Sequence, residues 1–490
     1  MFFNSALFIA FFSLVAIIYY VFPEKSRWIW LLISSYIFYM SWNVKMVVVL
    51  ITVTLATYIG GLLLSKNKEN VRAKKTIVTL CILISIGILF LFKYYNFTAM
   101  VCNAISGRVG LEMSIPTFDI VMPIGISFFT FKSVGYIIDV YRNKVEAERN
   151  VFKYALFVSF FTELTAGPID RSYNLLPQIT EPRKFSYKGV RQGLVVFGLG
   201  MFEKIVVSDR LAILVDTVYN DSSSYKGFTI IVAMIFFAFQ IYCDFASYST
   251  MALGCSKILG FDVIDNFKSP YLSKNIREFW HYWHISLSTW FRDYLYFPLG
   301  GSRCSRLRKY FNLMVVFLVS GLWHGASLTF IIWGALHGAY QIISDLTKNL
   351  RTKVKAYLGI NERTIGYRFW CISCVFVLVG FSWIFFRANS IHQAISVVKS
   401  IFYFNPWIFV DGSLFKLGLD VNNFMLAVFG VMLVIAADIL KKYYIKVSDI
   451  ILRQNAIFRW GIYIALVLFM LIFGIYGPAY DAQKFIYAQF

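Results

Sequence analysis

The chain has 490 residues, of which 59% are hydrophobic and 15% are charged, with a formal net charge of +21. Soluble domains average about 45–50% apolar and about 25% charged residues, so the composition excludes a set of soluble domains as well as disordered, collagen-like and disulfide-knot proteins. Cytosolic loops of membrane proteins collect Lys and Arg, and no nucleic-acid-binding motif accompanies the charge, so we expect no nucleic-acid partner.

The predicted elements are membrane spans, each of which needs about 20 mostly apolar residues. Clear candidates are 5–22, 28–42, 44–64, 76–92, 228–250, 369–386, 424–440 and 461–474. Weaker or interrupted candidates are 120–140, 152–166, 193–207 and 311–343. Together they predict an all-α polytopic membrane protein with about eleven transmembrane helices plus re-entrant or interfacial helices. The first stretch has no basic segment before it, so we expect a retained span rather than a cleaved signal peptide.

Loop charges predict the orientation of these spans. Basic residues concentrate in the loops 66–75, 142–149, 303–309, 348–355 and 441–446. They are sparse in 107–118, 220–225 and 405–422. Since basic loops stay in the cytosol, we expect both termini to lie outside.

Among the middle elements, Gln240–Ser249 places Asp244 in an otherwise apolar span. An intramembrane carboxylate is costly, so it needs a partner. Two interpretations are open: Asp244 pairs with an Arg or His of a cavity, or it belongs to a structural buried ion pair.

The segment Asn275–Gly301 is apolar enough to enter a membrane but carries several ionisable groups, namely Arg277, Glu278, His281, His284, Arg292 and Asp293. Such clusters usually line a protein cavity. On one continuous helix, Glu278, His281, His284 and Ser288 would share a face. An interfacial helix anchored by tryptophans fits the composition equally well. The His-x-x-His spacing also permits a metal site, but no further ligand cluster accompanies it, and we expect no metal.

His324 lies inside the apolar stretch 311–343, where polar groups are costly. If the stretch is helical, Ser320 and Ser327 flank the imidazole on one side. The pattern fits either a functional histidine or one that is hydrogen-bonded between helices. His337, further along the same stretch, fits the second interpretation better.

Two histidine-bearing motifs resemble the membrane-bound O-acyltransferase superfamily, most closely its bacterial alginate O-acetyltransferase-like branch. They are FWHYWHISLSTWFRDYLYFPLGGSR at 279–303 and SGLWHGASLTFIIWGALHG at 320–338. Supporting stretches are PIGISFFTFKSVGYIIDVYR at 123–142, AGPIDRSYNLLPQI at 166–179, QIYCDFASYSTMALG at 240–254 and FSWIFFRA at 381–388. The resemblance covers nearly the whole chain. It implies one integral-membrane acyltransferase domain at 1–490, with its histidine-motif core at 270–345.

The resemblance also implies a ring of helices around a central tunnel in a bacterial cytoplasmic (inner) membrane. The implied activity moves an acyl group from a cytosolic thioester to a hydroxyl on the far side. The active-site histidine of the family falls on His324, and its second motif histidine falls on His284. This sequence departs from the pattern at Lys132, where relatives often carry glutamine, and at Thr162-Glu163, where Pro-Gln is common.

The chemistry of these side chains suits acyl transfer. A positioned imidazole can take the proton of a hydroxyl as it attacks a thioester, so we expect His324 to be the general base. A variant is that His324 first takes the acyl group covalently. His284 and the Trp323 indole are candidate donors to the developing negative charge. Arg292 and the basic loop 303–309 are candidates to attract donor phosphates, and we expect Asp244, Asp293 and Ser288 to line the tunnel.

Three functions follow for testing. The leading one is an O-acetyltransferase that uses acetyl-CoA to modify an extracytoplasmic polysaccharide, directly or through a partner protein's hydroxyl. YFPLGGSR and NLLPQ favour this branch, whereas GPIDR resembles the branch that transfers D-alanine from an acyl carrier protein to teichoic acid. A glycan or lipid transporter is the alternative from another class, but no inverted repeat is visible in the sequence.

Overall fold

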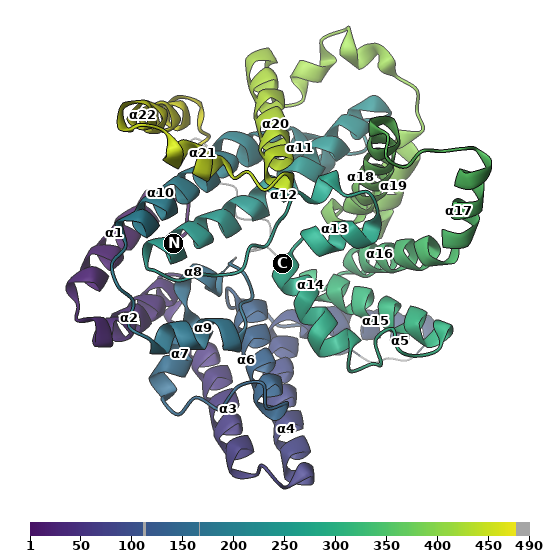
Figure 1. Ribbon diagram of the computed structural model, residues 1–490. Helices are drawn as coiled ribbons and strands as arrows, with labels where there is room; N and C mark the ends of the chain where they lie inside the picture. The colour runs from purple at the N-terminus through teal and green to yellow at the C-terminus, as the bar shows by residue number, and fades with distance from the viewer. Residues whose placement is uncertain (111–113, 166, 477–490) are drawn as a thin grey trace. The chain divides into compact units, whose positions relative to one another are not determined.

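A computed structural model describes residues 1–110, 114–165 and 167–476, and within these ranges the chain is helical, without β-strands (Figure 1). Residues 111–113 of the predicted loop 107–118 lie outside these ranges. So does residue 166, which ends one predicted span and begins one motif.

Six of the described helices are long and apolar enough to cross a membrane. They are Val44–Lys66, Val71–Val109, Phe228–Ile258, Ile365–Arg387, Val421–Lys442 and Ala456–Phe473. Each overlaps one of the clearly predicted spans, although Val71–Val109 extends well past the predicted 76–92, and the predicted stretch 5–22 forms a shorter apolar helix, Ala6–Val21. The finding confirms an all-helical membrane protein, while the total of about eleven transmembrane helices stays a prediction.

The chain forms two compact units, residues 1–197 with 251–264 and residues 198–250 with 265–490. The helices of the first unit are α1 (Ala6–Val21), α2 (Arg27–Met40), α3 (Val47–Lys66), α4 (Val71–Leu89), α5 (Tyr95–Val109), α6 (Ile126–Tyr141), α7 (Val151–Ser159), α8 (Phe161–Leu164) and α9 (Ser172–Thr180). The helices of the second unit are α11 (Asp209–Asn220), α13 (Ile276–Tyr282), α14 (Ile285–Phe291), α15 (Arg306–His324), α16 (Leu328–Leu346), α17 (Lys348–Tyr357), α18 (Ile365–Arg387), α19 (Ile391–Ile401), α20 (Val421–Lys442), α21 (Val447–Arg453) and α22 (Ala456–Phe473). Helices α10 (Tyr187–Phe202) and α12 (Phe228–Ile258) have residues in both units.

In the first unit, α3, α4 and α6 lie side by side (Figure 1). Glycines allow their close approach: a Cβ on Gly60 would collide with Cys81 of α4, and one on Gly61 would lie 2.8 Å from the Tyr136 hydroxyl of α6. Helices in membranes pack through such small residues because lipid supplies no hydrophobic drive between them.

A buried ion pair joins α6 to α8 in the same unit. The Lys132 Nζ lies 2.7 Å from the Glu163 Oε2, and the two side chains are 1% and 0% exposed. Lys132 also lies over the Phe157 ring, 4.8 Å from its centroid. The two positions at which the sequence departs from the family pattern are therefore partners, and each charge compensates the other.

In the second unit, α15 and α16 form a tight antiparallel hairpin that positions the second histidine motif. A Cβ on Gly321 would collide with the Phe330 carbonyl, and one on Gly334 with the Phe317 carbonyl. The Ser327 side chain accepts a hydrogen bond from the Thr329 amide and so caps the start of α16. The stretch 311–343 is therefore not one span, and Ser327 does not flank His324 on a helix, because the chain turns at residues 325–327.

Candidate active site

His284 lies at a break between two short helices. Its backbone is left-handed (φ 43°, ψ 57°), and it precedes α14 directly. A non-glycine residue in this region costs roughly 1–3 kcal/mol and persists only where neighbouring structure enforces it. Here the Asn266 backbone carbonyl accepts from the Ile285 amide at 2.9 Å, and the Lys268 amide donates to the Tyr282 carbonyl at 3.1 Å. The segment 266–268 thus holds both sides of the break.

This break corrects the prediction of one continuous helical face. Glu278 and His281 belong to α13, whereas His284 and Ser288 belong to the start and middle of α14. His281 is exposed and His284 is fully buried, so the His-x-x-His spacing does not place them together. Across the described ranges, no three His, Cys, Asp or Glu side chains converge in a way that could hold a metal ion.

His324 is the last residue of α15 and is almost completely buried. Three aromatic rings surround its imidazole: the centroids of Trp323, Trp333 and Phe386 lie 4.9, 5.0 and 5.4 Å away. The hairpin requires glycine at the next position, because a Cβ on Gly325 would collide with the Phe330 ring. The close packing at Gly325 therefore fixes His324 as the last residue of α15.

The structure brings the two motif histidines to one indole. The Trp323 ring centroid lies 5.8 Å from that of His284 and 4.9 Å from that of His324. The three side chains come from the two separate sequence motifs. The catalytic roles of His324, His284 and Trp323 stay predictions.

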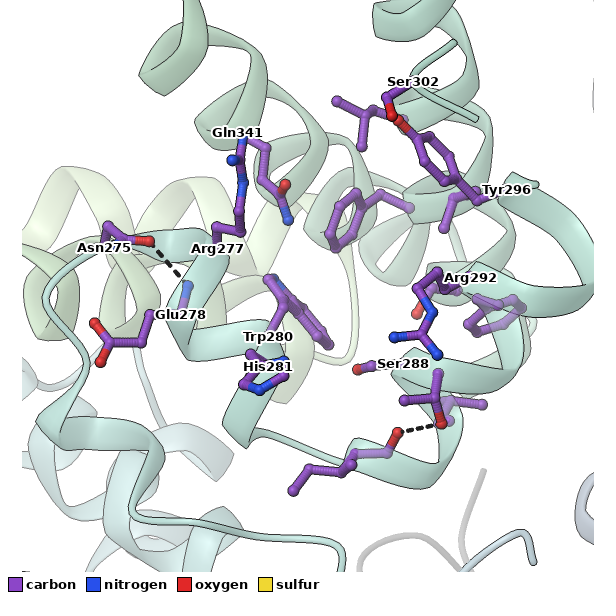
Figure 2. Close-up of a pocket in the computed structure, with 18 of the residues that line it drawn as sticks. Asn275, Arg277, Glu278, Trp280, His281, Ser288, Arg292, Tyr296, Ser302 and Gln341 are labelled. Atoms are coloured by element: carbon purple, nitrogen blue, oxygen red, sulfur yellow. Dashed lines mark hydrogen bonds between the residues drawn. The ribbon is translucent and has the colours of Figure 1, made fainter. Parts of the chain in front are cut away.

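A cavity of about 760 Å³ leads along the helices that carry these histidines (Figure 2). On α15, its lining residues Leu313, Phe317 and Ser320 recur at spacings of four and three, and His324 is the next residue on that face. On α14, the lining residue Ser288 follows His284 by one helical turn. Both histidines thus lie one turn beyond a serine of the cavity wall.

The charged lining of this cavity is mostly basic. Figure 2 shows Arg292 across the cavity from Arg277 and Glu278, and Lys309 also lines it. Arg292 donates to the Asp293 carboxylate at 2.9 Å, so Asp293, which does not line the cavity, orients Arg292.

A second carboxylate organises the other cations of the cavity. Lys309 donates to Asp345 at 2.8 Å, and this hydrogen bond holds the pKa of Asp345 below its usual value. Arg277 lies 3.9 Å from the same carboxylate. Asp345 and Asp293 lie outside the lining, so the wall itself presents three cations and one carboxylate, Glu278. Guanidinium and ammonium groups at the wall suit a phosphorylated ligand.

His337 has a structural role that the hydrogen bonds define. Trp280 donates from its indole nitrogen to Nδ1 of His337 at 3.2 Å, so Nε2 carries the ring proton and donates to Ser382 at 2.9 Å. The Ser382 hydroxyl donates in turn to the Val379 carbonyl at 2.7 Å. His337 therefore ties α13, α16 and α18 together and holds Trp280 in the cavity wall.

Asp244 lies away from the cavity lining, in a buried ion cluster. Lys204 contacts the carboxylates of Asp244 and Asp209 at 2.5 and 2.7 Å. Lys204 belongs to a π-helical segment, Glu203–Ser208, within the predicted stretch 193–207. The geometry favours the structural ion-pair interpretation over a tunnel role. Reasoning from sequence missed Lys204, although a lysine in an apolar stretch is itself a signal of a buried partner.

Comparisons with known proteins show what the chain is similar to. Residues 142–386 match the model of the membrane-bound O-acyltransferase family. A probable alginate O-acetylase of Pseudomonas aeruginosa is 37% identical over 448 residues, 91% of this chain and 82% of the relative. A peptidoglycan O-acetyltransferase of Helicobacter pylori is 32% identical over 403 residues, 76% of this chain and 73% of the relative. A teichoic acid D-alanyltransferase of Streptococcus thermophilus is 30% identical over 239 residues, 45% of this chain and 56% of the relative.

Proposed function

The chain belongs to the membrane-bound O-acyltransferase family and is an O-acyltransferase, and we propose that it moves an acetyl group from cytosolic acetyl-CoA to an extracytoplasmic hydroxyl. The proposal rests on the contact of the Trp323 indole with both motif histidines, next to a cavity that α14 and α15 line. The acetylase relatives match a far larger share of the chain than the D-alanyltransferase does, which favours acetyl over D-alanyl transfer.

The proposed acceptor is a cell-envelope or secreted polysaccharide, reached directly or through the hydroxyl of an extracytoplasmic partner protein. The relatives named for alginate and peptidoglycan acetylation support this acceptor class. The proposal treats residues 1–490 as one acyltransferase domain in the bacterial inner membrane, with both termini outside and the histidine core at 270–345. A tunnel through the ring of helices would join the two compartments.

His324 is the proposed general base. Its imidazole takes the proton of the acceptor hydroxyl while the oxygen attacks the thioester carbonyl carbon. The C–S bond then breaks, and the departing thiolate takes the proton to give free CoA thiol. Trp323 contacts both imidazoles, and in this proposal Trp323 and His284 donate to the carbonyl oxygen as negative charge develops. The same placement serves a second route, in which His324 first carries the acetyl group itself.

The experiment that tests this function is thiol release by the purified full-length protein. With acetyl-CoA and a polysaccharide acceptor, we expect free thiol to appear only when both are present. If the protein does not turn over acetyl-CoA but transfers D-alanine from a D-alanyl carrier protein, the alternative donor is established. Glycan movement across a membrane without any thiol release would place the protein in the transporter class.

Replacing Arg292 with alanine is expected to raise KM for acetyl-CoA while leaving kcat nearly unchanged. A hydrogen bond to a charged group contributes about 1.5–3 kcal/mol, so the increase should be roughly 10- to 100-fold. The thiol-release assay measures both constants. Arg363→Ala removes the same charge from an exposed loop outside the cavity and should leave KM unchanged. Equal effects of the two variants would show that Arg292 does not bind the donor.

A further inference from the structure

A second, smaller cavity lies in the first unit, where α1 ends and α2 begins. Its volume is about 190 Å³. The residues that line it come from the α1–α2 connection, α7, the end of α9 and residue 261. The acyl-transfer chemistry proposed above uses none of them.

The cavity contains a buried cation whose hydrogen-bond partners are all neutral. Arg27 is 8% exposed, and it donates to the backbone carbonyls of Phe22, Tyr20 and Arg183. A guanidinium has five N–H groups, so these three bonds leave two for a ligand. Among the residues that the structure describes, no carboxylate forms an ion pair with Arg27, although burial of a cation is costly without a counter-charge.

Further cations line the same cavity. Lys25 and Lys153 both contribute to its wall, and Lys153 lies over the Trp28 ring, 5.8 Å from the centroid. Arg183 has a 3.7 Å contact to Glu181, whose side chain is 70% exposed. Two carboxylates thus face four cations in the lining, an excess that attracts an anion.

The surroundings of the cavity are those of a membrane boundary. The Val21 side chain is 78% exposed at the end of α1, and Ile29 is 41% exposed in the first turn of α2. Arg27 also lies over the rings of Tyr19 and Tyr20, at 5.3 and 5.2 Å. Aromatic rings and cations beside exposed apolar side chains are typical of the interface between lipid headgroups and acyl chains.

We propose that this cavity binds the phosphate group of an anionic phospholipid. The free N–H groups of Arg27 and the ammonium groups of Lys25 and Lys153 hold the phosphate, and the acyl chains lie along Val21 and Ile29. Inorganic phosphate shares the charge of this headgroup but has no acyl chains. A lipid site must therefore bind phosphatidylglycerol in preference to inorganic phosphate and to zwitterionic phosphatidylcholine.

The test is thermal unfolding of the full-length protein in detergent, with phosphatidylglycerol, phosphatidylcholine or inorganic phosphate added. We expect phosphatidylglycerol to raise Tm more than the other two probes do. The double variant Lys25→Gln/Lys153→Gln should lose more than half of the response that is specific to phosphatidylglycerol. The matched control Lys66→Gln/Lys68→Gln removes two charges from another loop of the same unit and should keep it.

Three results would overturn the proposal. One is an undiminished phosphatidylglycerol response in the Lys25/Lys153 variant, and another is an equal loss in the control. The third is protection by inorganic phosphate that matches phosphatidylglycerol, which would assign the cavity to a soluble anion. Native mass spectrometry, which counts phosphatidylglycerol molecules retained by each folded variant, separates lost binding from lost stability.

Discussion

Replacement of His324 by alanine is expected to lower kcat for acetyl transfer by about 100- to 10,000-fold, the range that a general base contributes. His324 lies one helical turn beyond Ser320, which lines the 760 Å³ cavity proposed to bind the donor. Alanine therefore removes the base without changing a residue of the cavity lining. Initial rates of acceptor-dependent thiol release measure the effect. KM for acetyl-CoA should change little, because His324 does not line the donor cavity.

His392→Ala is the matched control for this prediction. His392 is an exposed histidine of α19, so its loss should leave kcat unchanged. Both variants must insert into the membrane and elute as the wild type does on size exclusion. Turnover by His324→Ala at a near wild-type rate would remove His324 from the chemistry. Incubation of the wild type with labelled acetyl-CoA alone separates the two routes, since only the covalent one leaves label on His324.

Replacement of Lys204 by methionine is expected to lower the free energy of unfolding by about 3–5 kcal/mol, the cost of breaking a buried ion pair. The variant would leave the carboxylates of Asp244 and Asp209 buried together without their counter-charge. Unfolding of the purified protein in detergent measures the loss.

A neutral version of the same cluster provides the control for Lys204. The triple variant Lys204→Met/Asp244→Asn/Asp209→Asn removes every charge at once and should be destabilised less than Lys204→Met. In the folded fraction, turnover should persist, because Asp244 lies outside the cavity lining. Normal stability of Asp244→Asn together with lost turnover would instead return Asp244 to a role in the substrate tunnel.

The long apolar helices could be predicted from sequence because the bilayer demands length and hydrophobicity, and both are local properties. The turn after His324 was also readable: Gly325 and the N-cap residue Ser327 are ordinary signals for ending one helix and starting another. Their apolar surroundings made 311–343 resemble one interrupted span. The break at His284 carries no such signal, because no glycine or proline marks the left-handed residue.

The contacts between side chains of separate helices could not be predicted from the sequence. Lys132 and Glu163 each stood out as departures from the family pattern, and Asp244 stood out as an intramembrane acid. Their pairing depends on how separate helices pack, which no spacing rule encodes. The same holds for Trp333, which no periodicity connects to His324 although their rings lie 5.0 Å apart.

In the proposed function, His324 receives its two substrates from opposite sides of the membrane. Sealed proteoliposomes that enclose a polysaccharide acceptor, with acetyl-CoA supplied only outside, test it most directly. We expect acetylated acceptor inside, free CoA thiol outside, and neither product with His324→Ala. Acetylation that occurs only when donor and acceptor share one compartment would contradict it.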